Sequence, residues 1–179
     1  MISIPTIITL SRILIILPFV LVATDNPLLG AILFSIASLT DLLDGYVARK
    51  TRQVTKLGIL LDPIADKLLV ISALILLVDT ATIPAWIAII IIAREFIVTG
   101  LRIAALSKDI MIPAEMGGKI KMGCQIAAIL VLFIEKTLLL DRIMPDIDFY
   151  SLGIALLWTA MVLGVISGVQ YFILFWKRI

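Results

Sequence analysis

The sequence contains no histidine and only one cysteine. The absence of histidine excludes Ser-His-Asp and Cys-His catalytic sites and any His-ligated zinc site. Cys124 has no second cysteine to pair with and lies in an apolar run, so we expect it to act as a small packing residue. No cleavable signal peptide is expected, because Arg12 interrupts the first apolar run and no A-x-A site follows.

Charge is also scarce. Charged residues make up 16% of the 179 positions and hydrophobic residues 62%, and the mean hydropathy is +1.20. A soluble domain would contain about 25% charged and roughly 45–50% apolar residues. The formal net charge of +2 is too small to predict binding to nucleic acid. The composition therefore predicts an integral membrane protein.

Hydropathy predicts an all-α protein with six membrane-spanning helices, each near the roughly 20 residues that a helix needs to cross a bilayer. Residues 1–179 would form a single catalytic domain, with breaks at Asp25-Asn26-Pro27, Asp79, Pro113, Gly117-Gly118 and Pro145. The expected spans are 7–24, 29–48, 58–78, 83–105, 119–139 and 152–175.

The placement of basic residues predicts the orientation of these spans. Basic residues gather in the second and fourth loops and at the end of the chain, whereas the remaining loops are acidic or mixed. Because Lys and Arg accumulate in cytoplasmic loops, both termini are expected in the cytoplasm. We expect a multi-pass protein of a bacterial plasma membrane. The basic residues of these two loops and of the chain end are Arg49, Lys50, Arg52, Lys56, Arg102, Lys108, Lys119, Lys121, Lys177 and Arg178.

Two pairs of aspartates flank the second loop. Asp41 and Asp44 end the second span, and Asp62 and Asp66 begin the third. Their spacings of three and four residues place each pair on one helix face. Ionisable groups inside apolar helices are costly, and clustered carboxylates repel one another unless cations neutralise them. We therefore expect a divalent-metal site at the cytoplasmic end of the helices.

The chemistry of these ligands indicates the cofactor. Carboxylate oxygens favour hard cations, so we expect two Mg²⁺ or Mn²⁺ ions, which suit phosphoryl or phosphatidyl transfer. Arg49 is placed to bind a phosphate through its two-pronged guanidinium. The alternative is a structural ion-pair network that joins the aspartates to Arg49, Lys56 and Lys67. Four acids on two matched faces favour the metal site.

Asp41 to Asp66 reads D-x-x-D-G-x-x-A-R-x8-G-x-x-x-D-x-x-x-D. This pattern resembles the signature of the CDP-alcohol phosphatidyltransferases and matches every fixed position of it. Six spans and a cytoplasmic site are also similar to that family. The resemblance implies that an alcohol displaces CMP from a CDP-linked lipid on a two-metal site, in a homodimer.

The same resemblance implies roles for individual residues. Asp41 and Asp62 would each bridge both metals, while Asp44 would complete the shell of one metal and Asp66 that of the other. Asp66 would also be the general base that takes the proton of the alcohol. The implied contacts to the CDP-lipid are Gly45, Ala48, Arg49, Thr55, Gly58 and Thr6.

A second polar group lies on the fourth and fifth spans. Arg94 and Arg102 are eight residues apart, about two turns, and therefore lie on roughly the same side. Lys119 and Lys121 begin the fifth span at the same membrane face. A cationic pocket beside a metal site predicts a second phosphate, and so an anionic acceptor alcohol. The lysines could alternatively extend to the interface, whereas Arg94 lies nearer the middle of its span.

Two further segments point to one branch of the family. Arg94–Arg102 and Gly118–Gln125 read R-E-F-x-V-T-G-L-R and G-K-x-K-x-x-x-Q, which resemble the phosphatidylglycerophosphate synthase branch. Ile4–Arg12 is similar to that branch too, although Ser3 and Thr6 stand where Asn is common. The branch uses CDP-diacylglycerol and sn-glycerol 3-phosphate and makes phosphatidylglycerol phosphate and CMP for phospholipid biosynthesis.

Other functions remain open from the sequence alone. Within the family the acceptor could be inositol phosphate, which would also need a cationic pocket, or a second phosphatidylglycerol. A protein of another class, a cation or proton transporter, could use the four aspartates as a relay. That reading is disfavoured because the aspartates lie at one end of the spans, and because no inverted repeat or pair of broken helices is evident.

Overall fold

The computed structural model describes residues 4–51, 56–106, 116–137 and 146–177; it describes side chains for residues 13–40, 67–105, 118, 120–137 and 146–177. Within these ranges the chain forms six helices and no strand, which confirms the expected all-α fold. The helices are α1 (Ile4–Val22), α2 (Pro27–Thr51), α3 (Lys56–Asp79), α4 (Ala85–Leu106), α5 (Met116–Glu135) and α7 (Phe149–Trp176).

Each expected span overlaps one of these helices, and the bounds agree to within about one turn. The largest differences are in α5. Gly117 and Gly118, expected to precede this helix, lie in its first turn, where glycine carries less of the penalty that it has in a helix interior. The helix ends at Glu135 rather than 139, because the backbone N–H of Thr137 donates to Ile134 O at 2.9 Å in a closing turn.

Polar side chains fix where two of the helices begin. Asn26 Oδ1 accepts the backbone N–H of Leu29 at 3.1 Å, directly before Pro27, the first residue of α2. Asp148 caps α7 and accepts the backbone N–H of Ser151 at 2.9 Å. The hydroxyl and backbone N–H of Ser151 both hold the pKa of Asp148 below its ordinary value.

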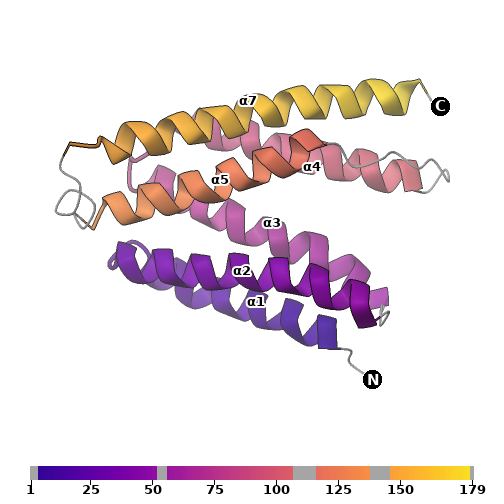
Figure 1. Cartoon of the computed structure of the whole chain (residues 1–179), viewed down its shortest axis with the longest axis horizontal. Helices are drawn as coiled ribbons and strands as arrows, with labels where there is room; N and C mark the ends of the chain where they lie inside the picture. The colour runs from indigo at the N-terminus through magenta and orange to yellow at the C-terminus, as the bar shows by residue number, and fades with distance from the viewer. Residues whose placement is uncertain (1–3, 52–55, 107–115, 138–145, 178–179) are drawn as a thin grey trace.

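Successive helices run in alternating directions (Figure 1). Helix α5 packs most extensively on α7, and α4 also packs on α7. On the other side α1 packs against α2 and α3, and α3 reaches α4 and α5. The start of α1 and the end of α7 lie at the same end of the bundle (Figure 1). The end of α2 and the start of α3 lie at this end too.

The core joins helices from both sides of the bundle. The ring of Phe19 on α1 lies 5.9 Å from that of Phe34 on α2 and 5.8 Å from that of Phe133 on α5, measured between centroids. Close packing of α5 on α7 depends on Gly153, because a Cβ atom at this position would lie 2.7 Å from Cγ of Leu132. The contact of Phe19 with Phe133 therefore joins the two sides of the bundle, and Gly153 allows α5 and α7 to pack closely.

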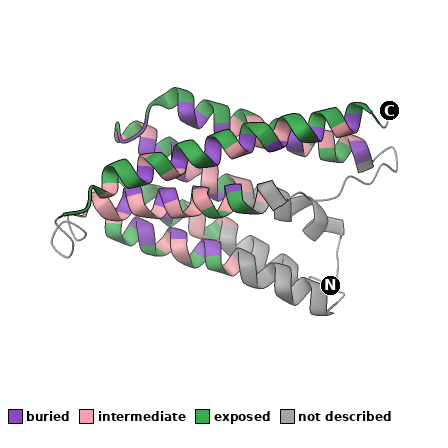
Figure 2. Ribbon diagram, turned by 45° about the horizontal axis from the view of Figure 1, so that its top comes forward, coloured by how far each residue is buried: buried purple, intermediate pink, exposed green. Residues whose placement is uncertain are grey.

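Many large apolar side chains are exposed on the outside of the bundle, where Figure 2 marks exposed residues in green. Leu14 is 71% exposed, Ile89 63% and Trp176 70%, an exposure of large apolar groups that is typical of a lipid-facing surface. Among the described residues, α7 is the one helix that is long and apolar enough to cross a membrane. Two shorter apolar stretches occupy 13–22 and 27–40, so the other expected spans remain predictions.

Candidate functional site

The four predicted metal ligands lie on two neighbouring antiparallel helices. Asp41 and Asp44 belong to α2, and Asp62 and Asp66 belong to α3, which packs against α2. Asp44 and Asp62 are each about two turns from the connection between the helices, and Asp41 and Asp66 about three turns. The backbone therefore places the two pairs at matched depth. Their side chains lie outside the described residues.

The predicted CDP-lipid contacts are distributed over the same region. Gly45, Ala48 and Arg49 belong to α2, Gly58 lies in the first turn of α3, and Thr6 belongs to α1, while Thr55 lies outside the described residues. The described side chains include no group of three or more His, Cys, Asp or Glu that could hold a metal ion. The four aspartates and these contacts are not in that described set, so their roles remain predictions.

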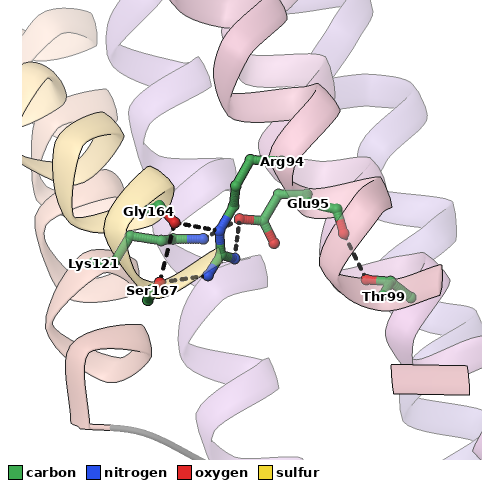
Figure 3. Close-up of polar contacts among 6 residues, drawn as sticks. All are labelled: Arg94, Glu95, Thr99, Lys121, Gly164 and Ser167. Atoms are coloured by element: carbon green, nitrogen blue, oxygen red, sulfur yellow. Dashed lines mark hydrogen bonds and ion pairs between the residues drawn. The ribbon is translucent and has the colours of Figure 1, made fainter. Parts of the chain in front are cut away.

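Arg94, near the middle of α4, is the centre of a described polar cluster (Figure 3). Its Nε donates to the backbone oxygen of Gly164 at 2.8 Å, and its Nη2 donates to Ser167 Oγ at 2.6 Å. Its Nη1 donates to Glu95 Oε1 at 3.1 Å. The first two bonds join α4 to α7, so the guanidinium is fixed in place by groups from both helices.

Glu95 joins this cluster to α5. The Nζ of Lys121 donates to the same Glu95 oxygen, Oε1, that accepts from Arg94. Lys121 is buried, and the Glu95 side chain is 18% exposed. Two of the residues predicted to bind the acceptor phosphate, Arg94 and Lys121, are thus brought together around one carboxylate. This carboxylate offsets part of their positive charge.

The other two predicted phosphate ligands are not seen in the cluster. Arg102 is exposed on α4, and its side chain makes no hydrogen bond or ion pair among the described residues. The side chain of Lys119 lies outside the described set. Their assignment to the acceptor pocket therefore remains a prediction.

A cavity lies between α3, α4 and α5 beside this cluster. Its empty volume is about 440 Å³, including the space at its opening. Four of its lining side chains are polar, and the rest are apolar. One of the polar residues, Lys67, directly follows the predicted base Asp66 on α3. The lining residues are Lys67, Val70, Ile71, Leu74, Ile91, Ile92, Glu95, Lys121, Met122, Gln125 and Ile126.

Two lysines and one glutamate therefore line a space that also has apolar walls. Such a lining suits a small organic anion, because the excess positive charge attracts it and the few polar groups orient it.

Sequence reasoning missed the contribution of α7. A Cβ atom at Gly164 would lie 3.4 Å from Cδ of Lys121, and one at Gly168 would lie 3.5 Å from Cγ of Arg94. The two glycines thus leave room for these long side chains, and Ser167 between them accepts from Arg94. The spacing of small residues on α7 could have predicted a close contact at this position. Which side chains make that contact depends on how the helices pack.

Comparison with known proteins identifies the family. The sequence model of the CDP-alcohol phosphatidyltransferases matches residues 2–166, which include the aspartate pattern and also Arg94, Glu95 and Lys121. The chain belongs to this family. The resemblance carried by Asp41 to Asp66 is thereby confirmed.

Several curated proteins similar to this chain carry the name CDP-diacylglycerol–glycerol-3-phosphate 3-phosphatidyltransferase. The protein from Bacillus subtilis is 45% identical over 152 residues, which cover 85% of this chain and 76% of the relative. The protein from Rickettsia bellii is 36% identical over 178 residues, which cover 95% and 93%. The protein from Shigella flexneri is 38% identical over 180 residues, which cover 94% and 92%.

Proposed function

We propose that this protein transfers the phosphatidyl group of CDP-diacylglycerol to sn-glycerol 3-phosphate, giving phosphatidylglycerol phosphate and CMP. The observation that carries the proposal is the complete signature from Asp41 to Asp66. The chain also matches relatives named for this reaction over most of their length. The cationic cluster beside the cavity adds support, because it suits an acceptor that is itself a phosphate ester.

The donor set on α2 and α3 fits two Mg²⁺ or Mn²⁺ ions, because it consists of four carboxylates from two packed helices at matched depth. In this proposal Asp41 and Asp62 would contribute to holding both ions, and Asp44 and Asp66 would each contribute to holding one. When bound, the ions would neutralise charge on the transferring phosphate. Asp66 takes the proton of the acceptor hydroxyl as the new phosphate ester bond forms and the bond to CMP breaks.

The remaining predicted residues bind the two substrates. Gly45, Ala48, Arg49, Thr55, Gly58 and Thr6 are proposed to contact the CDP-lipid, with Arg49 on its diphosphate. Arg94, Arg102, Lys119 and Lys121 are proposed to contact the acceptor phosphate. A guanidinium has five N–H donors, and the described bonds of Arg94 use three of them, which leaves two for a ligand.

The proposal includes a membrane arrangement. All six helices would cross a bacterial plasma membrane, with both termini and the site facing the cytoplasm, and two copies would form a homodimer. The alternating helix directions, together with the start of α1 and the end of α7 at one end of the bundle, support termini on the same side of the membrane. The exposed apolar side chains support insertion into a bilayer. A site that opens at the cytoplasmic face would be accessible both to soluble glycerol 3-phosphate and to a donor lipid in the membrane.

The reaction can be tested with purified protein in detergent. Incubation with CDP-diacylglycerol, labelled glycerol 3-phosphate and Mg²⁺ should release CMP and place the label in a lipid phosphate. Omission of glycerol 3-phosphate should abolish both signals. Release of CMP only with inositol phosphate or only with phosphatidylglycerol would assign a different acceptor. No release with any acceptor would overturn the proposed function.

A further inference from the structure

Gln125 is a buried polar side chain without a hydrogen-bond partner in the part of the chain that the structure describes. It is 3% exposed, and it lies on α5 one turn beyond Lys121. It lines both the main cavity and a smaller hollow that Arg94, Glu95 and Gly164 also line. Buried carboxamides in proteins are nearly always hydrogen-bonded, so this amide is expected to bond to whatever occupies the cavity.

The neighbours of Gln125 indicate which part of an occupant it meets. Lys67 and Lys121 supply positive charge to the same cavity, and Glu95 is already bound to Lys121 and Arg94. The cationic groups therefore suit the anionic part of a ligand. The carboxamide is neutral and both donates and accepts hydrogen bonds, which matches a hydroxyl group in either direction.

We propose that Gln125 binds the non-reacting hydroxyl of the acceptor alcohol, and so selects a phosphorylated polyol over a phosphorylated alcohol that lacks this hydroxyl. The inference rests on the proposed function and adds to it a determinant for the uncharged part of the acceptor. In sn-glycerol 3-phosphate this group is the hydroxyl on carbon 2. The hydroxyl on carbon 1 reacts, and the phosphate occupies carbon 3.

The test compares sn-glycerol 3-phosphate with 3-hydroxypropyl phosphate, which keeps the reacting hydroxyl and the phosphate but lacks the hydroxyl on carbon 2. The wild-type protein should prefer glycerol 3-phosphate by roughly tenfold in kcat/KM, as expected for a lost hydrogen bond to a buried amide. Gln125→Met, a near-isosteric apolar replacement, should abolish most of this preference. It should act mainly by raising the KM for glycerol 3-phosphate.

Two further variants and a stability measurement complete the design. Cys124→Ala, at the adjacent position of α5 and outside the cavity lining, should keep the wild-type preference. Gln125→Asn retains an amide and should keep part of the preference, which covers the case in which Gln125→Met does not fold. The melting temperature of Gln125→Met should equal or exceed that of wild type, because the replacement removes a buried unpartnered amide.

The outcomes separate this inference from the proposed function. If the wild-type protein uses neither acceptor, the proposed function is wrong. If it uses glycerol 3-phosphate but does not prefer it over 3-hydroxypropyl phosphate, the role of Gln125 is wrong. The role is also wrong if Gln125→Met keeps the full preference. If Gln125→Met does not fold, an unchanged preference in Gln125→Asn, with Cys124→Ala matching wild type, rejects the role instead.

Discussion

Arg94 on α4 donates a hydrogen bond of 2.6 Å to the hydroxyl of Ser167 on α7, a residue 73 positions further along the chain. The same guanidinium reaches the backbone oxygen of Gly164 one turn earlier on α7. A polar link therefore connects α4 to α7, in addition to the ring contact of Trp86 with Trp158. In surroundings of low dielectric constant, bonds from a charged donor are stronger than in water.

Ser167→Ala should lower the stability of the protein, because it leaves one N–H of a partly buried guanidinium without its partner. We expect a loss of about 1.5–3 kcal/mol in the free energy of unfolding, the usual contribution of a hydrogen bond to a charged group. Thermal unfolding in detergent measures this change. Thr159→Ala is the matched control, since its hydroxyl donates only within α7, to Ala155 O at 2.8 Å. Equal melting temperatures for both variants would contradict the link.

Glu95→Gln should lower the melting temperature but strengthen acceptor binding. The substitution removes the carboxylate that offsets the charges of Arg94 and Lys121, so the two cations repel each other more and attract a phosphate more strongly. The acceptor KM should fall severalfold at low ionic strength, and the difference from wild type should shrink as salt is added. A raised KM would instead mean that Glu95 holds the two cations in the orientation that binds the acceptor.

Asp66→Asn and Asp62→Asn should each abolish most turnover even at saturating Mg²⁺. Loss of a general base alone lowers a rate by roughly 10²–10⁴-fold, and loss of a metal ligand adds to this. Chelation should abolish wild-type activity, and added Mg²⁺ or Mn²⁺ should restore it. Asp79→Asn, an exposed position at the far end of α3, serves as the control and should keep normal turnover. Near-normal rates in both aspartate variants would remove the two-metal proposal.

Gly153→Ala should destabilise the contact between α5 and α7. The added Cβ would lie 2.7 Å from both Cγ and Cδ2 of Leu132, which must move in a packed core, at a cost of about 1–3 kcal/mol. Gly123→Ala provides the opposite case at an exposed position of α5, because nothing lies within 4 Å of a Cβ atom added there. That variant should gain about 0.5–1 kcal/mol from helix propensity. Parallel melting curves decide the point, and the prediction is wrong if Gly153→Ala melts at or above the wild-type temperature.

The cap at Asp148 predicts a dependence of stability on pH. Hydrogen bonds from the hydroxyl and backbone N–H of Ser151 lower its pKa below the ordinary value of 3.8. Because the folded pKa is below the unfolded one, the stabilisation is complete above the unfolded value and is lost as pH falls through the folded value. Asp148→Ala should therefore melt below wild type at neutral pH, and the gap should close in acid. A gap that is constant across a pH series would contradict this assignment.

The six helices could be predicted because the sequence alternates apolar runs with polar, proline or glycine breaks. The ends were less accurate because they depend on local hydrogen bonds. The turn at Thr137 ends α5 earlier than hydropathy suggests, and the cap at Asp148 begins α7 earlier. Hydropathy changes gradually along the chain, whereas a cap acts at one residue.

The candidate site was only partly accessible to sequence reasoning. Arg94 and Lys121 could be singled out, because a cation in an apolar helix requires a partner or a ligand. The roles of Glu95 and Ser167 could not, since they depend on α5 and α7 lying beside α4. Gln125 belongs to a segment that resembles the family, but its burial and lack of a described partner follow from packing alone.

The spacing of Gly164 and Gly168 is the G-x-x-x-G pattern that commonly joins transmembrane helices of separate chains. In this protein the backbone groove formed by the two glycines holds Arg94 and Lys121 of the same chain. The groove is thus used for folding rather than for association. A homodimer would have to form through a different face, and substitutions at these glycines would report on α4 and α5 instead of on oligomeric state.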